Sequence, residues 1–196
     1  TGGCDELIYK TISLLNSEKI IPGEYDVICA PDITGLIAHE AFGHGVEMDM
    51  FLKDRAKSKD YIGKQVASPI VTMRDGSCAL DHCGTYLFDD EGVIGKDTTI
   101  IKDGILKSGI NDELTALALN NEFTGNGRRE SFDRKAYTRM TNTFFEKGNS
   151  KLEDMIASID YGFLIDDSQS GMEDPKNWGI QCVASIGKEI KNGKLT

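Results

Sequence analysis

The sequence predicts an α+β fold with a largely antiparallel sheet of hairpins and a few helices, one of which bears a histidine motif. Short β-prone runs are joined by Asp-Gly and Asn-Gly pairs, the turn signals of two-residue hairpins. Other stretches place apolar residues at helical spacing. With 196 residues, 39% of them hydrophobic, the chain is long enough for one compact domain.

The first elements are a helix, a strand and a second helix. Residues 4–20 hold apolar residues at helical spacing, and a Pro-Gly pair ends that helix. Residues 24–30 predict a short strand. Asp32 is the expected N-cap of a helix that begins near Ile33. Residues 49–66 are polar and mixed, which indicates a loop or a short helix on the surface.

Strands dominate from residue 68 onward. The run 69–73 is followed by Arg74-Asp75-Gly76, which predicts a hairpin turn, and residues 98–101 predict another strand. The segments 100–106 and 189–195 resemble each other, and each predicts two strands joined by a type I′ turn. This similarity is weak evidence for a duplicated β unit.

Two further helices are expected in the second half of the chain. Residues 111–121 carry leucines at helical spacing. Residues 150–159 form the other helix, and Ser150 and Glu153 predict a capping box at its start.

The composition excludes several classes of protein. A net charge of −10 disfavours direct nucleic-acid binding. No apolar run approaches the length of a membrane span, and no secretory signal is evident. Cys78-x4-Cys83 lacks a CxxC partner, so the five cysteines indicate reduced thiols in a cytoplasmic protein. The chain begins without methionine, so we expect a fragment of a longer protein, or a processed one.

The segment His39-Glu40-Ala41-Phe42-Gly43-His44 contains two of the chain's three histidines. Zinc prefers imidazole nitrogen, and an adjacent carboxylate can take a proton from a zinc-bound water. In the common HExxH arrangement the histidines are four residues apart on one helical face. Here they are five apart, so a regular α-helix at about 100° per residue would leave them roughly 140° apart.

Two distortions would bring the histidines together. A π-bulge absorbs one residue, or the helix ends at Gly43 and His44 turns back. Either distortion predicts zinc bound by His39 and His44, with Glu40 as general base. The alternative is an incidental histidine pair. Glu47 and Asp49 follow the motif, and either orients a histidine or is merely solvated.

The motif and four further segments resemble the TldD/PmbA family, also named modulators of DNA gyrase. These segments are Asp89-Asp90-Glu91-Gly92, the hairpin 103–106, Thr124-Gly125-Asn126-Gly127-Arg128-Arg129-Glu130-Ser131 and Arg139-Met140-Thr141-Asn142-Thr143. Thr138 stands where the family has a proline before the last of them. The resemblance runs from about Tyr25 to Thr196 and is strong, because independent motifs occur in the same order.

The resemblance implies the catalytic portion of a cytoplasmic zinc peptidase that hydrolyses short or unfolded peptides, with a zinc-bound water as nucleophile and Glu40 as base. It implies a related subunit without the motif as heterodimer partner, or a homodimer, and no membrane. Residues 1–24 would be a linker helix, and the family's N-terminal domain and extreme C-terminus would be absent. The alternative is a non-catalytic interaction module or partner subunit linked to gyrase modulation.

The family takes its third metal ligand from a cysteine that would lie beyond Thr196. We therefore expect this chain alone to be inactive and to bind zinc weakly, since a catalytic zinc normally uses three protein ligands. The alternative outcome is that Cys78, His82, Cys83 or Cys182 completes the site. His82 is otherwise expected to be a surface or turn residue.

Arg128, Arg129 and Asn126 are candidate substrate-binding residues. With Arg134 and Arg139, the two arginines form a basic cluster in an acidic chain. Guanidinium groups pair with carboxylates in a bidentate manner, so the cluster could hold a substrate carboxylate or peptide backbone. Equally, the arginines could pair with the acidic segment 89–91 as part of the scaffold.

Overall fold

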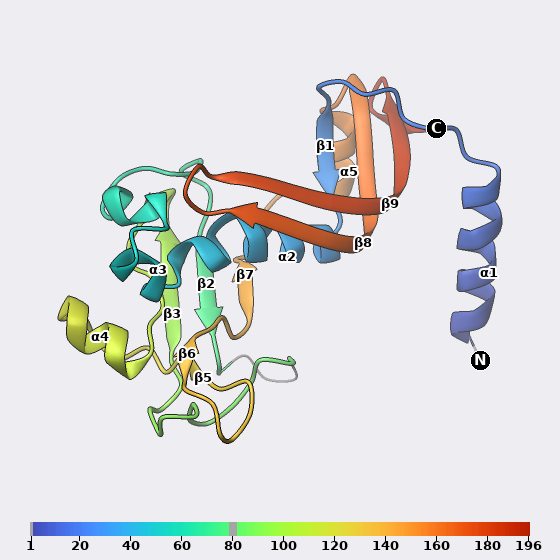
Figure 1. Ribbon diagram of the computed structural model, residues 1–196. Coiled ribbons are helices and arrows are strands. Elements are labelled where there is room, and N and C mark those ends of the chain that lie inside the picture. Colours follow the sequence, from blue (N-terminus) through green and yellow to red (C-terminus); the bar gives the residue numbers. More distant parts are fainter. Residues whose placement is uncertain (1, 79–81) are drawn as a thin grey trace.

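The computed structural model describes residues 2–78 and 82–196, and it confirms the α+β prediction with mostly antiparallel strand pairing (Figure 1). The helices are α1 (Gly2–Leu15), α2 (Pro31–Ala38), α3 (Asp49–Leu52), α4 (Glu113–Leu119) and α5 (Leu152–Ala157). The strands are β1 (Asp26–Cys29), β2 (Met73–Gly76), β3 (Asp97–Lys102), β4 (Ile105–Leu106), β5 (Gly127–Arg128), β6 (Tyr137–Thr138), β7 (Thr143–Phe145), β8 (Tyr161–Asp174), β9 (Gly179–Lys191) and β10 (Lys194–Leu195).

One sheet has the order β1-β8-β9-β10 and is dominated by the long β8–β9 hairpin. β1 pairs in parallel with the start of β8, and the remaining pairs are antiparallel. The far half of the hairpin extends out of this sheet and runs alongside α2 (Figure 1). At its tip the ring of Trp178 lies 4.4 Å from that of Tyr61 and 5.6 Å from that of Phe42. The hairpin therefore reaches from its own sheet to the region of Phe42 and Tyr61.

The second sheet has the order β4-β3-β2-β7 and holds the main core. Its buried side chains include Met73, Ile100, Ile101 and Leu106, all at most 1% exposed. Ala38, the last residue of α2, is fully buried in the same cluster. The histidine motif thus begins where α2 meets this core, with the β8–β9 hairpin also packed against it.

Both predicted type I′ hairpins are present. Asp103 and Gly104 have φ of 51° and 78°, and Asn192 and Gly193 have φ of 50° and 73°, the left-handed values that such turns require. The two hairpins belong to different sheets: one joins β3 to β4 and the other joins β9 to β10.

Several local predictions were wrong. The first helix ends at Leu15 and not at the Pro-Gly pair 22–23, and of the run 69–73 only Met73 lies in a strand. Arg74-Asp75-Gly76 lies within β2 and is not a turn, because Asp75 is buried and its carboxylate accepts hydrogen bonds from the hydroxyls of Thr141 and Thr143. Ala30, not Asp32, is the N-cap of α2, and the Asp32 carboxylate instead accepts the backbone N–H of Ser168 on β8 at 2.7 Å. The N-cap of α5 is Lys151, with no side-chain cap from Ser150.

The first helix, α1, stands apart from the two sheets in Figure 1. Its apolar side chains are exposed, with Leu7 at 65% and Leu15 at 80%. In the described part of the chain, none of the helices combines the length and apolar character needed to cross a membrane.

Candidate metal centre

The five-residue spacing of the histidines is accommodated by a single π-helical turn. α2 ends at Ala38, and residues His39–Gly43 are π-helical, with the backbone N–H of His44 donating to the carbonyl of His39. The imidazole rings face each other edge-on, with centroids 4.6 Å apart and ring planes at 89°. The predicted distortion is confirmed in its π-bulge form. Gly43 keeps right-handed geometry (φ −67°), so the left-handed alternative is wrong.

Close packing explains the glycine inside this turn. A side-chain carbon at Gly43 would collide with the sulfur of Met140, which lies beside the motif in the core. The turn therefore packs closely against Met140 at the edge of the core.

The ligand atoms of His39, Glu40 and His44 all lie within 4.8 Å of one another. Two imidazole nitrogens are ligands that suit zinc, and the adjacent carboxylate is close enough to reach a water on the metal, so these residues fit the metal that the motif implies. Across residues 2–78 and 82–196, no other group of three metal-binding side chains gathers in this way. His82, Cys78 and Cys83 are exposed and do not join the cluster.

The surroundings shift the pKa values of the two histidines in opposite directions. Burial lowers the pKa of His39, and the neighbouring His44 lowers it further. The pKa of His44 is raised, chiefly by its hydrogen bond to Glu47. Because metals bind the neutral imidazole, the lowered pKa of His39 favours coordination.

Glu40 is only 7% exposed. Burial raises its pKa, and a hydrogen bond from its carboxyl group to Glu173 on β8 raises it further. A raised carboxyl pKa brings the group closer to the range in which it can exchange protons near neutral pH.

Of the two carboxylates that follow the motif, Glu47 is the one that contacts a histidine. It is 1% exposed, and its Oε2 lies 3.4 Å from Nδ1 of His44 and 3.6 Å from Nη1 of Arg139. When Nδ1 of His44 carries the proton and donates it to this carboxylate, Nε2 keeps its lone pair and is free to bind a metal. Asp49 is also buried, but its carboxylate pairs with Lys53 at 2.7 Å.

Replacing Glu47 with Gln is expected to weaken zinc binding by about 10- to 100-fold, because His44 would lose the charged group that orients its ring. The measurement is a competitive zinc titration, against a chromogenic chelator, of the complete protein that contains this chain and carries the substitution. Asp49→Asn is the matched control, since Asp49 has similar burial and does not contact a histidine. Equal zinc affinity in Glu47→Gln and the unchanged protein would contradict this role.

A hollow of about 620 Å³ opens in front of the two histidines. Its walls include Arg128, Arg129, Arg134, Lys135, Arg139, Tyr137, Glu47, Glu130 and Met140. The predicted substrate-binding residues Arg128 and Arg129 therefore lie beside the metal-binding motif. Asn126 does not line the hollow: it is 2% exposed, and its amide donates to Asp75 at 2.8 Å and to the carbonyl of Arg139 at 2.9 Å. Its contacts hold the wall in place.

The acidic segment 89–91 does not neutralise these arginines. The Asp89 carboxylate accepts the backbone N–H groups of Glu91, Val93 and Gly127, and Asp90 accepts the backbone N–H of Arg129. Glu91 accepts the backbone N–H of Glu113 at 2.7 Å. The interpretation that the arginines pair with this segment is therefore wrong: its carboxylates accept backbone N–H groups and form no ion pair with the described guanidinium groups.

Sequence reasoning missed the part of the site that β8 and β9 contribute. A side-chain carbon at Gly171 would lie 2.6 Å from Cγ of Glu40, so only glycine leaves room for that carboxylate. Cys182 is paired with Gly171 in the strand ladder, and its thiol pKa is raised by burial and then by Glu40. Nothing in the local sequence marks these residues, because the register of the hairpin alone brings them to the motif.

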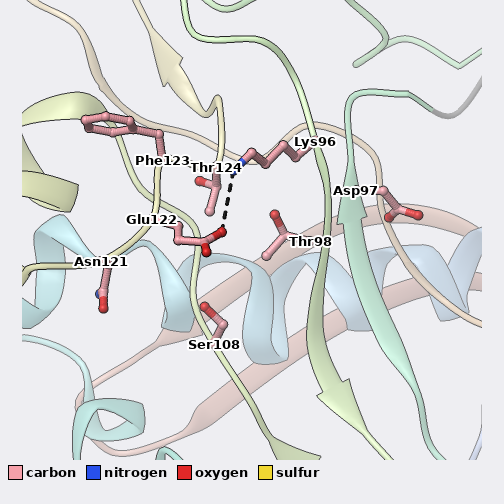
Figure 2. Close-up of a pocket in the computed structure, with 8 residues that line it drawn as sticks. All are labelled: Lys96, Asp97, Thr98, Ser108, Asn121, Glu122, Phe123 and Thr124. Carbon is pink, nitrogen blue, oxygen red and sulfur yellow. Dashed lines mark ion pairs between the residues drawn. The ribbon is translucent and has the colours of Figure 1, made fainter.

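A second hollow, of about 350 Å³, is formed by residues 96–98, Ser108 and residues 121–124 (Figure 2). Lys96 and Glu122 pair at 3.6 Å between its walls. None of its lining residues is a histidine or cysteine, and none belongs to the metal-binding motif. We therefore place the candidate chemistry in the larger hollow.

Two histidines and a glutamate brought within 4.8 Å of one another by one helical segment are the kind of residue group that metallohydrolases use. Residues 22–196 match the PmbA/TldA metallopeptidase C-terminal domain. The chain belongs to this metallopeptidase family.

Named relatives agree with this assignment. The chain is 38% identical over 186 residues to a metalloprotease TldD homolog of Buchnera aphidicola, covering 94% of this chain and 38% of that protein. It is 32% identical over 188 residues to a zinc metalloprotease TldD homolog of Saccharolobus solfataricus, covering 95% and 42%. The chain thus spans about two fifths of the length of these relatives.

Solved structures share the fold. A Thermotoga maritima protein described as a modulator of a DNA gyrase matches with a TM-score of 0.81 and 25% identity, over 96% of this chain and 42% of that one. TldE from Thermococcus kodakarensis matches with a TM-score of 0.77 and 23% identity, over 97% and 44%.

Proposed function

We propose that the chain forms the catalytic centre of a zinc-dependent peptidase, with His39 and His44 as metal ligands and Glu40 as general base. The observation that carries the proposal is the π-turn, which brings both imidazoles and the Glu40 carboxylate to one point. A helix distortion of this kind is frequently found at functional sites. The zinc metalloprotease name of the Saccharolobus relative supports the choice of metal.

Zinc in this position would polarise the scissile carbonyl and acidify a water molecule. The chain's own residues transfer the proton, orient a metal ligand and bind the peptide. Glu40, buried and with a raised pKa, takes the proton from the attacking water and passes it to the leaving amine. Glu47 keeps the ring of His44 in one orientation, and the hollow in front of the histidines receives the peptide.

The substrate in this proposal is a short or unfolded peptide, because an extended chain can enter the hollow whereas a folded domain would meet its walls. We further propose that the protein acts in the cytoplasm and assembles with a related subunit that lacks the motif, or with itself. A third protein ligand would come from outside residues 1–196, and the isolated chain would be inactive without it.

The test is hydrolysis of a mixture of short peptides by the complete protein that contains this chain, followed by mass spectrometry. The expected result is new peptide termini that appear with zinc, disappear with a chelator and return when zinc is restored. A complete protein that binds zinc at this site but cleaves no peptide, alone or with a related subunit, would favour the alternative of a non-catalytic interaction module.

A further inference from the structure

The charge of the hollow contrasts with that of the chain. The chain carries a net charge of −10, whereas five cationic and two acidic side chains line the hollow. One of the two acids, Glu47, is already shared between His44 and Arg139. The space beside the histidines is therefore a local positive region in an acidic protein, and such a region concentrates anionic ligands.

Four of these cations have no carboxylate partner. Within the described residues, Arg128, Arg129, Arg134 and Lys135 form no ion pair, and all four are exposed. Arg74 shows the contrast in the same fold, since it pairs with both Asp97 and Glu146. The guanidinium groups of Arg128, Arg129 and Arg134 therefore have no carboxylate partner in the described part of the chain, in contrast to Arg74.

The fold holds the backbone of this basic wall while leaving its charges available. Arg128 pairs with Tyr137 in the β5–β6 ribbon, and the guanidinium of Arg129 donates to the carbonyl of Arg134. The nearby carboxylates of segment 89–91 accept backbone N–H groups instead of neutralising the arginines. These contacts hold the basic wall, by which we mean Arg128, Arg129, Arg134 and Lys135, and its four cations remain without a carboxylate partner among the described residues.

Two of these cations make cation–π contacts with tyrosine rings, which do not cancel their charge. The guanidinium of Arg128 lies 5.8 Å from the ring centre of Tyr86, and the ammonium group of Lys135 lies 5.0 Å from that of Tyr137. A cation held over a ring keeps its net charge and loses part of its conformational freedom. Both effects favour binding of an anion.

Resting on the proposed peptidase function, we infer that this basic wall binds a carboxylate of the peptide substrate and so selects peptides that present one close to the scissile bond. The carboxylate is either the C-terminal α-carboxylate or the side chain of Asp or Glu, since both offer the planar pair of oxygens that guanidinium groups match. Nucleic acid is the less favoured ligand, because the acidic remainder of the chain would repel a long polyanion.

The test uses the complete protein with Glu40→Gln, which binds peptide without cleaving it, and fluorescence anisotropy of labelled peptides at low salt. Three peptides are compared: one with a free C-terminus and an internal Glu, one with an amidated C-terminus, and one with that Glu replaced by Gln. We expect loss of the recognised carboxylate to weaken binding about tenfold, as charge-assisted contacts at an exposed site imply. The peptide whose binding weakens identifies the source of the carboxylate.

Arg128→Gln combined with Arg134→Gln should remove this discrimination, leaving the peptides within about twofold of one another. Arg128→Lys with Arg134→Lys should restore part of it, because the charge is kept. Lys188→Gln combined with Lys194→Gln is the matched control: both lysines are exposed on β9 and β10, neither lines the hollow, and the pair removes the same two positive charges.

Equal affinity for all three peptides would overturn the inference, as would full discrimination in the double Gln variant. Tight binding of a single-stranded oligonucleotide that the double variant abolishes would also do so. These outcomes are separate from the peptidase proposal. Hydrolysis without carboxylate discrimination removes only this inference, whereas discrimination without hydrolysis by the unmutated protein removes only the catalytic role.

Discussion

Glu40→Gln is expected to abolish most peptidase activity while leaving zinc bound. The side chain is 7% exposed and lies between the histidines and β8, so the isosteric amide fits the same space. The amide cannot take a proton from water, and a positioned general base is worth about 10²- to 10⁴-fold in rate. The metal should remain, because the two imidazoles that hold it are unchanged.

The measurement is the steady-state kcat of the complete protein, alone or with its subunit, with zinc content determined on the same sample. Glu153→Gln is the control, since Glu153 is an exposed carboxylate on α5 outside the site. A Glu40→Gln protein that retains zinc and cleaves peptides at more than about a tenth of the normal rate would exclude Glu40 as the base.

Gly171→Ala is expected to reduce kcat about 100-fold by displacing the Glu40 carboxylate. The added carbon would lie 2.6 Å from both Cγ and Cδ of Glu40, well inside contact distance, so the glutamate has to move. Gly171 does not have a positive φ, so alanine introduces no backbone strain of its own. A shift of about 1 Å in a catalytic group is enough for an effect of this size.

Gly187→Ala is the matched control on the neighbouring strand β9, because its added carbon would make only an ordinary 3.9 Å contact with Phe163. We expect that control to keep normal activity and both variants to keep their zinc. A Gly171→Ala protein with unchanged kcat would mean that Glu40 tolerates displacement, and so that its placement by β8 is not important for the reaction.

The sequence was informative wherever short-range rules apply. The Asp103-Gly104 and Asn192-Gly193 pairs identify their turns because few other residues tolerate the left-handed backbone there. The five-residue histidine spacing predicts a distorted helix, since a regular one cannot bring the rings together. Asp75 was misassigned to a turn because its three hydrogen-bond partners lie more than 50 residues away.

The rest of the site depends on long-range register. Gly171 and Glu173 lie more than 130 positions from Glu40 in the sequence. They reach it because the β8–β9 hairpin extends beyond its own sheet and packs along the motif helix. Asn126 shows the converse case: it occupies a conspicuous Gly-Asn-Gly segment, yet its amide is committed to Asp75 and to a backbone carbonyl.

The most direct test of the central claim is the zinc content of the complete protein, measured by inductively coupled plasma mass spectrometry after purification in trace zinc. We predict about one zinc per chain in the unmutated protein and in His82→Ala, and almost none in the double variant His39→Ala, His44→Ala. The same zinc content in that double variant as in the unmutated protein would contradict the claim that the π-turn histidines form the metal site.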